Sequence, residues 1–393
     1  MKILDVAEFY AEAGGGVKTY IEQKLATLPV LGHEVVIVAP GARDAESPRP
    51  GGRVIWVRSP RLPFDRRYRM FASAEAVRSI LERERPDVLE CSSPWSAASV
   101  CSEWTDAAAR SLVLHQDPIA VYPGTLLSSH IGEDRMHRIF GWHWRRTRKL
   151  TRRFDATVVA SHWYARRLRR FGAGNTRVIP LGIHRDRFAR ARRDPALRRE
   201  LLERCGLGEG AALLVAVGRH HPEKRIGTLI EAMERVNEGR SAGLVLFGDG
   251  PLRRWIERRA AKAGGVHVAG QIRDHDWLTR ALASADVFLH GSSAETFGLA
   301  VAEAMSAGLP VVTPDDGAAA DLVHPRFSAT YPAGDSAACA DAIAGLLERL
   351  PEIHPDLVRR FAAGRIQTAE SHFRALMLCY EGILNAKARP VTA

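Results

Sequence analysis

Two glutamates in the stretch HGSSAETFGLAVAEAMSAGLPVV (290–312) are spaced so that they could bind two ends of one extended ligand. The pattern predicts a short strand, a loop that contains Glu295, and a helix that starts at about Phe297, contains Glu303 and ends at Gly308. Six helical residues place the two carboxylates roughly 9 Å apart along the helix axis, which is too far for a shared proton. The backbone N–H groups of Thr296 to Leu299 at the helix start would bind an anion. A capped helix that carries a surface carboxylate is the alternative interpretation.

Arg219 and Lys224 form a second candidate group, in VGRHHPEKRIGTLIEAM (217–233). They follow an apolar run that ends at Gly218. Arginine directs two N–H donors at phosphate oxygens, and lysine adds a mobile positive charge. Ligands of open α/β sheets bind beyond the carboxyl ends of the strands, so this position favours a phosphate group over two solvated cations.

The stretch EAGGGVKTY (12–20) places Gly15 and Gly16 before a predicted helix, where backbone amides can approach a phosphate closely. It lacks the GxGxxG pattern with a later acidic residue, which disfavours a nicotinamide cofactor. His220 and His221 have no third ligand at a suitable spacing, so we expect no metal. The five scattered cysteines indicate neither a zinc site nor a disulfide framework.

Length and patterning predict an α/β protein with two Rossmann-like, doubly wound domains. At 393 residues the chain exceeds the usual size of one hydrophobic core. Apolar runs separated by helical patterns indicate parallel sheets covered on both faces. The predicted strands are 2–6, 34–40, 54–57, 87–91, 112–116, 156–161 and 177–181, then 212–218, 244–248, 266–270, 286–291, 310–315 and 328–332. We expect domains at 1–183 and 184–371, facing a central cleft that binds ligands, and a helix at about 372–393 that could pack back on the first domain.

The net charge of +11 is concentrated in Arg-rich segments at 142–153, 165–170 and 185–200. These segments fit either a solvated surface or an anionic partner such as a lipid surface, whereas nucleic acid is disfavoured because no binding module accompanies them. The first residues do not resemble a signal peptide, and no apolar run approaches the ~18 residues that span a bilayer. We therefore expect a cytoplasmic protein, with peripheral association at the inner face of the membrane.

Several of these motifs together resemble one family, the retaining, nucleotide-sugar-dependent glycosyltransferases of family four, which have the GT-B fold. ETFGLAVAE (295–303) is similar to the family's E-x7-E motif, and VGRHHPEK (217–224) to its GR…PEK segment. GGGVKTYIEQKLATLPVLGHEVVIVAP (14–40) resembles the family's glycine loop with its helix and strand. VIPLGIHRDRF (178–188) resembles the linker between domains, with Leu181 in place of the usual asparagine.

The resemblance covers nearly the whole chain, is weakest at 60–150, and departs from the family pattern at Asp321, where a glutamate is usual. It implies that Arg219 and Lys224 hold the donor diphosphate. It also implies that Glu295 contacts hydroxyls of the donor sugar, with His115 near the transferred sugar. The implied catalytic residues are His115, Arg219, Lys224 and Glu295. The implied donor-binding residues are Gly15, Gly16, Gly218, Arg219, Lys224, Glu295, Thr296, Phe297, Gly298, Leu299 and Glu303, the last at the ribose.

The implied activity is transfer of a hexose, with mannose from GDP-mannose favoured, to a hydroxyl of a lipid, lipid-linked or polysaccharide acceptor. The leaving phosphate would accept the proton of the acceptor hydroxyl, while Arg219 and Lys224 stabilise the departing diphosphate. No metal or cofactor is required beyond the substrate nucleotide sugar. Donors such as UDP-glucose or UDP-N-acetylglucosamine remain open, as do a GT-B epimerase or phosphorylase and a non-catalytic protein that binds sugar nucleotides.

Overall fold

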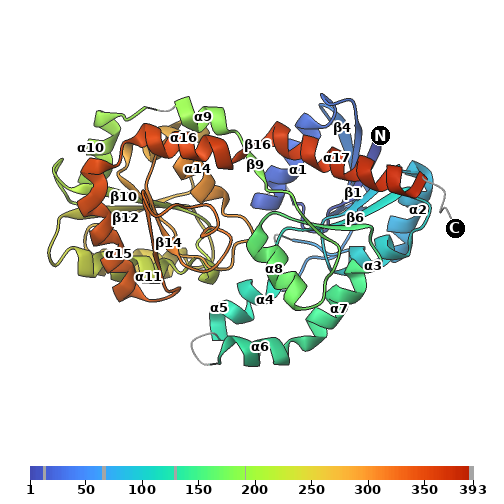
Figure 1. The fold of residues 1–393 in the computed structure, drawn as a ribbon, viewed down its shortest axis with the longest axis horizontal. Coiled ribbons are helices and arrows are strands. Elements are labelled where there is room, and N and C mark those ends of the chain that lie inside the picture. The colour runs from blue at the N-terminus through green and yellow to red at the C-terminus, as the bar shows by residue number, and fades with distance from the viewer. Residues whose placement is uncertain (12–14, 64–67, 128–130, 191, 389–393) are drawn as a thin grey trace. The chain divides into compact units, whose positions relative to one another are not determined.

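The computed structural model describes residues 1–11, 15–63, 68–127, 131–190 and 192–388, and the chain divides into two compact units (Figure 1). Unit 1 comprises Met1–Gln116, His137–Leu181 and Ala369–Ala393, and unit 2 comprises Asp117–Met136 and Gly182–Thr368. Each unit is built around its own mainly parallel sheet. The domain boundary predicted between residues 183 and 184 stays a prediction.

Unit 1 contains an eight-stranded sheet in the order β3-β4-β2-β1-β5-β6-β7-β8, which is parallel except where β3 pairs with β4. Its strands are β1 (Lys2–Val6), β2 (Glu34–Gly41), β3 (Ala45–Arg49), β4 (Gly52–Arg58), β5 (Val88–Cys91), β6 (Ala109–Leu114), β7 (Ala156–Val159) and β8 (Thr176–Val178). Its helices are α1 (Gly16–Thr27), α2 (Ala74–Glu84), α3 (Ser96–Glu103), α7 (Gly141–Thr151), α8 (His162–Arg170) and α17 (Ala369–Ala388). The strand order reverses between β1 and β5, which makes this pair a topological switch point.

Unit 2 contains a six-stranded parallel sheet in the order β12-β11-β10-β13-β14-β15, with its switch point between β10 and β13. Its strands are β10 (Ala212–Val217), β11 (Ala242–Phe247), β12 (Val266–Gly270), β13 (Val287–Leu289), β14 (Val311–Pro314) and β15 (Ser328–Tyr331), beside a small sheet of β9 (Gly182–Ile183) and β16 (Gln367–Thr368). Its helices include α4 (Pro118–Val121), α5 (Pro123–Leu127), α9 (Arg185–Arg190), α10 (Pro195–Arg204), α11 (Ile226–Val236), α12 (Arg253–Ala263), α13 (His275–Ser284), α14 (Leu299–Ala307), α15 (Ser336–Arg349) and α16 (Pro355–Arg365), and the short 3-10 helices η1 (Pro222–Lys224) and η2 (Leu350–Glu352). Helix α6 (Glu133–Ile139) contains residues of both units.

The predicted α/β class is confirmed, because the central strands form where continuous apolar runs are buried on both faces. All six residues of β11 are buried, for example, as are all four of β14. Figure 1 shows helices on both sides of the unit 2 sheet, with α14 and α16 on one side and α11 and α15 on the other. Strands β3, β9 and β16 were not predicted: β3 is a polar edge strand that contains Pro48, and the other two are only two residues long.

A buried charged cluster lies at the switch point of unit 1. Lys24 of α1 donates hydrogen bonds to Asp5 of β1 and to Glu90 of β5, and all three side chains are inaccessible to solvent. The hydroxyl of Tyr380 in α17 donates to the other oxygen of Glu90 at 2.7 Å. We call these four residues the unit 1 ion cluster, and through it the last helix of the chain is bound to the first sheet.

Candidate functional site

The strand ends of unit 2 bring the basic loop after β10 together with the acidic loop after β13. The two strands are neighbours in the sheet, whereas β11 lies on the other side of β10, so both loops leave from the switch point. Lys224, the last residue of η1, donates from Nζ to Oε1 of Glu295 in an ion pair. The two motifs that the sequence analysis treated separately therefore form one site.

This ion pair determines the protonation of both partners. Burial lowers the pKa of Lys224, but the carboxylates of Glu295 and Glu223 outweigh it, and the net pKa is raised. Burial raises the pKa of Glu295, but Lys224, His290 and the Gly298 N–H outweigh it, and the pKa falls to about 2. At neutral pH the site therefore contains a cation and an anion. The side chains are 20% and 18% exposed, so a ligand can reach both charges.

Arg219 lies beside the same pair and is held loosely. Its Nη2 atom is 3.8 Å from Oε1 of Glu223, and 28% of its side chain is exposed. The same Glu223 oxygen is 3.9 Å from Nζ of Lys224, so one buried carboxylate orients the two predicted phosphate ligands. The adjoining turns fit closely, because a Cβ atom on Gly248 would lie 1.9 Å from the carbonyl oxygen of Gly218.

Helix α14 begins later than predicted. It starts at Leu299, and Gly298 caps it with a φ of +93°, a conformation that strains any residue with a side chain. Phe297 and Thr296 are buried and lie before the helix, so the separation estimated for the two glutamates counted two residues that are not helical. The Gly298 N–H stabilises the Glu295 carboxylate, whereas the Leu299 N–H has no partner within the helix.

Glu303 lies in the second turn of α14 and is only partly exposed. Burial raises the pKa of Glu303 to about 7, although the positive charge of Arg187 in α9 opposes this shift. Arg187 Nε is also 3.5 Å from Oδ1 of Asp276 in α13, so the arginine interacts with two acidic residues. Near neutral pH, Glu303 can therefore accept or donate a hydrogen bond, as binding of a hydroxyl group requires.

The remaining predicted residues, Gly15, Gly16 and His115, lie in unit 1. Gly15 caps α1 and Gly16 is its first residue. Both are exposed, while Gly14 of the same triplet lies outside the described residues. His115 directly follows β6, with its ring centroid 4.6 Å from that of Tyr20 in α1. Burial lowers the pKa of His115 to about 4, so the imidazole is neutral at neutral pH.

Three residues of the unit 2 site were given no role from the sequence. Glu223 orients Lys224 and Arg219. Arg225, with a left-handed φ of 43°, donates from Nη1 to Oγ of Ser293 at 2.6 Å and so ties the two loops together. His290 lies 3.7 Å from Glu295. The signal available for His290 was its position directly after an apolar run, at the strand end.

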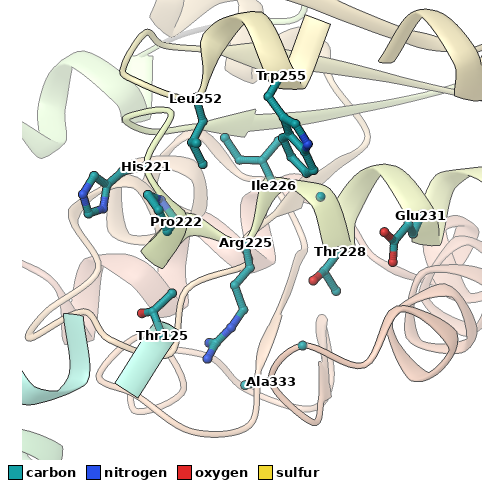
Figure 2. A pocket seen from close by; sticks show the side chains of 12 residues that line it. Thr125, His221, Pro222, Arg225, Ile226, Thr228, Glu231, Leu252, Trp255 and Ala333 are labelled. Carbon is teal, nitrogen blue, oxygen red and sulfur yellow. The ribbon is translucent and has the colours of Figure 1, made fainter. Parts of the chain in front are cut away.

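A cavity of about 550 Å³ adjoins η1 and the start of α11 (Figure 2). Its wall combines the apolar Ile226, Leu252 and Trp255 with polar groups such as Arg225 and Thr228. None of the predicted donor-binding residues lines it. Choosing the site by cavity size alone would therefore miss the Lys224–Glu295 pair.

Among the described residues, no three His, Cys, Asp or Glu side chains are grouped so as to hold a metal ion. Within the same ranges, no helix has both the length and the apolar character needed to cross a bilayer. The predicted independence from metal stays a prediction.

Comparison with known proteins identifies both halves of the chain. Residues 211–349 match the family model of glycosyl transferases group 1, and residues 14–187 match that of glycosyltransferase family 4. A GDP-mannose-dependent alpha-(1-6)-phosphatidylinositol dimannoside mannosyltransferase of Mycobacterium tuberculosis is 30% identical over 87% of this chain and 84% of its own length. A GDP-mannose-dependent alpha-mannosyltransferase of Corynebacterium glutamicum is 26% identical over 82% and 75%, respectively.

Solved structures share the fold. Sucrose-phosphate synthase from Thermosynechococcus elongatus superposes with a TM-score of 0.78 at 21% identity, covering 98% of this chain and all of that one. Anabaena HepE in complex with UDP superposes with a TM-score of 0.71 at 18% identity, covering 97% and 100%. Because a relative is 30% identical over most of both chains, and the two family models match adjoining parts of the chain, the second of which contains Lys224 and Glu295, the chain belongs to the family 4 (group 1) glycosyltransferases and is a hexosyltransferase of GT-B fold.

Proposed function

We propose that this protein is a retaining α-mannosyltransferase that transfers mannose from GDP-mannose to a hydroxyl of a lipid, lipid-linked or polysaccharide acceptor. The Lys224–Glu295 pair, partly exposed at the β10–β13 switch point, is the observation that carries the proposed donor site. Two relatives described as GDP-mannose-dependent mannosyltransferases support the choice of donor, and the dimannoside substrate of one of them supports a glycolipid acceptor.

In this proposal the two cations of the site bind the donor diphosphate. The Arg219 guanidinium and the Lys224 ammonium lie 3.8 and 3.9 Å from the same Glu223 oxygen, which is longer than a hydrogen bond. Both side chains can therefore turn to phosphate oxygens. Glu295, an anion at neutral pH, accepts hydrogen bonds from hydroxyls of the sugar. Glu303 binds the ribose hydroxyls, and its pKa of about 7 makes donor affinity depend on pH near neutrality.

The proposed chemistry needs stabilisation of charge and correct positioning more than proton transfer by the protein. The bond from the anomeric carbon to the phosphate oxygen breaks, and the acceptor oxygen bonds to the same face of that carbon. The leaving phosphate takes the acceptor's proton. Arg219, Lys224 and the N-terminal amides of α14 stabilise the negative charge that develops on the diphosphate. These cations would replace a divalent metal, and His115, neutral at neutral pH, would bind a hydroxyl of the transferred sugar.

A donor-binding experiment tests the choice of sugar nucleotide. The melting temperature is measured with GDP-mannose, UDP-glucose, UDP-N-acetylglucosamine and ADP-glucose. A ligand at 100 times its dissociation constant stabilises the folded state by about 2.7 kcal/mol. We expect GDP-mannose to give the largest shift and Lys224→Ala to lose it. A larger shift with another donor would replace mannose in the proposal, and no shift with any donor would contradict it.

Product analysis tests the type of reaction. With mannosides or membrane lipids from a mannoside-synthesising bacterium as acceptors, NMR of the new glycoside is expected to show the α-anomer, formed equally well in EDTA. A β-linked product would contradict retention, and activity that EDTA abolishes and Mn²⁺ restores would contradict metal independence. Conversion of the donor to an isomeric sugar nucleotide without acceptor would identify an epimerase instead.

We also propose that the protein binds an anionic membrane through one face of α7. Exposed Trp142, Arg145 and Lys149 lie at helical spacing on this face, close to Ile139, of which 56% is exposed. A tryptophan beside basic residues suits the interface of an anionic bilayer. The Arg-rich segment at 185–200 is less available, because Arg193 and Arg198, for example, pair with Asp286.

Vesicle sedimentation tests this surface. Binding to vesicles that contain phosphatidylglycerol is expected to fall with added salt and in the variant Trp142→Ala/Arg145→Glu/Lys149→Glu. A matched control is Trp255→Ala/Arg254→Glu/Arg258→Glu on α12, which also exposes a tryptophan among arginines. Equal losses in both variants would show a non-specific charge effect and contradict the assignment to α7.

A further inference from the structure

We propose that His290 is a positioning residue: it becomes the hydrogen-bond partner of Glu295 when Lys224 turns to the donor diphosphate, and so holds the carboxylate where the donor sugar needs it. This inference rests on the proposed donor site. It adds to that site a residue that exchanges partners on donor binding and acts only through Glu295.

The position of His290 is fixed by its surroundings. It directly follows β13, its backbone N–H donates to the carbonyl of Val312 at 2.8 Å, and its carbonyl accepts from the hydroxyl of Tyr331 at 2.9 Å. The side chain is only 4% exposed. The imidazole therefore cannot turn out into solvent, and it remains next to the loop that carries Glu295.

The ring nitrogen Nε2 lies near the carboxylate of Glu295. It lies 3.7 Å from Oε1 of Glu295, the same oxygen that accepts from Lys224. Among the described residues, Nε2 has no hydrogen-bond partner. A distance of 3.7 Å exceeds that of a hydrogen bond by somewhat under 1 Å. Without a ligand, the Glu295 oxygen therefore accepts from Lys224, and His290 does not yet donate to it.

A second partner becomes necessary when the donor binds. A phosphate oxygen of the donor competes with Glu295 for the ammonium group of Lys224, and in this proposal the ammonium turns from the carboxylate to the phosphate. Removing the cation from a carboxylate that is largely shielded from water costs free energy, unless another hydrogen-bond donor replaces the cation. In the donor complex the sugar hydroxyls donate to Glu295, and the Gly298 N–H already contributes to it. On the protein side, the His290 Nε2 at 3.7 Å is a further group able to take the place of the ammonium.

The packing around the two side chains leaves room for this exchange. A cavity of about 20 Å³ is lined by Lys224 and His290, together with Gly218 and Gly291. Protein interiors are close-packed, so a side chain can shift by a fraction of an ångström only where such space exists. His220 lines the same cavity, and among the described residues neither of its ring nitrogens has a hydrogen-bond partner.

The charges that face His290 favour the exchange. Burial lowers the pKa of His290 to about 4, Glu295 opposes the shift, Lys224 adds to it, and the backbone of Ser292 opposes it. When phosphate neutralises Lys224, the charge that disfavours a proton on the ring is removed. The proton on Nε2 can be that of the neutral imidazole or of an imidazolium, and both donate to a carboxylate.

The test compares binding of a sugar nucleotide with that of its nucleotide alone. Calorimetry gives the affinities of wild type and His290→Phe for GDP-mannose and for GDP. Because Glu295 contacts the sugar, we expect His290→Phe to weaken GDP-mannose about tenfold and to leave GDP unchanged, as befits loss of one hydrogen bond to a charged group. His290→Gln, which supplies an N–H near the same place, is expected to recover most of the loss. His220→Phe is the matched control and should preserve the ratio of the two affinities.

Equal losses for GDP and GDP-mannose, or no loss for either, would overturn the role of His290 while leaving the donor site intact. If wild type binds another sugar nucleotide best, that compound and its nucleoside diphosphate replace the pair. If wild type binds none, the proposed function and this inference fail together. Should His290→Phe not fold, ¹⁵N NMR of the wild-type imidazole decides: a protonated Nε2 in the donor complex supports the proposal, and an unprotonated Nε2 overturns it.

Discussion

Both units place a lysine between carboxylates at the switch point of a parallel sheet, but at different depths along the strands. In unit 1, Asp5 and Glu90 lie opposite each other within β1 and β5, and Lys24 contacts both with no exposed surface. In unit 2, Lys224 and Glu295 lie beyond the ends of β10 and β13, where about a fifth of each side chain is exposed.

This difference in depth decides what the same chemistry can do. Inside the strands, neither water nor a ligand reaches the charges, and each group keeps its partner, so the unit 1 ion cluster connects α1 and α17 to the sheet. Beyond the strand ends, a ligand can replace one partner of an ion pair. The position of a charged pair relative to the strand end therefore separates a structural cluster from a binding site in this protein.

The largest effect on stability is expected from Lys24→Met. Loss of the ammonium leaves Asp5 and Glu90 without their cation in a site closed to water, which costs roughly 3–5 kcal/mol of unfolding free energy. Urea denaturation measures this loss. Lys24→Met/Glu90→Gln should recover part of it, because one fewer charge is buried. A loss below about 1 kcal/mol would show that the cluster is not sealed.

Lys224→Met is expected to have the opposite profile. If Lys224 stabilises the leaving diphosphate, its loss should lower the transfer rate by about 10²–10³-fold, as removal of one stabilising donor from an active site does. Its unfolding free energy should change far less than that of Lys24→Met, since both partners are partly hydrated. Single-turnover rates and urea denaturation measure the two quantities. If Lys224→Met kept the transfer rate of wild type but lost as much unfolding free energy as Lys24→Met, both lysines would have a structural role and the comparison would be wrong.

Two buried tyrosines extend the comparison to smaller effects. Tyr380 donates to the carboxylate of Glu90, whereas Tyr331 donates to the backbone carbonyl of His290. Hydrogen bonds to charged groups are worth about 1.5–3 kcal/mol and neutral ones about 0.5–1.5. Tyr380→Phe should therefore destabilise the protein more than Tyr331→Phe in denaturant titrations at about pH 8 to 9, above the pKa of about 7 of Glu90. The reverse order would mean that Glu90 is neutral in the folded state.

The two glutamates should contribute opposite slopes to the dependence of stability on pH, each at most about 1.4 kcal/mol per pH unit. Burial raises the pKa of Glu90 to about 7, so its contribution is present below the ordinary value of 4.5 and is lost as pH rises towards 7. Despite burial, Lys224 and His290 lower the pKa of Glu295 to about 2, so its contribution is present above 4.5 and is lost as pH falls towards 2.

Unfolding free energies measured from pH 3 to 8 test these slopes. Glu90→Gln should remove the decline between about pH 4.5 and 7, and Glu295→Gln should remove the rise between the lowest pH and about 4.5. If each substitution changed the slope in the pH window of the other, the contrast between the unit 1 ion cluster and the Lys224–Glu295 pair would be wrong.

Much of the fold was predictable because buried parallel strands are continuous apolar runs, and twelve of the thirteen predicted strands overlap observed strands within a few residues at each end, while the segment 177–181 only begins with the last residues of β8. The start of α14 was predicted two residues early, because the left-handed conformation of Gly298 depends on the packing of the loop against Ala319. The roles of Glu223 and His290 were missed although their contacts lie within single loops, because residue spacing does not show how an irregular loop folds.

The sequence by itself determined the class of fold, the family motifs and the loops that contain Arg219, Lys224 and Glu295, because apolar periodicity and local spacing are properties of neighbouring residues. Only the tertiary structure decided that Lys224 and Glu295 form one ion pair, that His290 lies behind it, and that Lys24 is sealed between Asp5 and Glu90. The physical reason is burial: whether a charge meets water, a ligand or another charge depends on which strand ends the fold brings together.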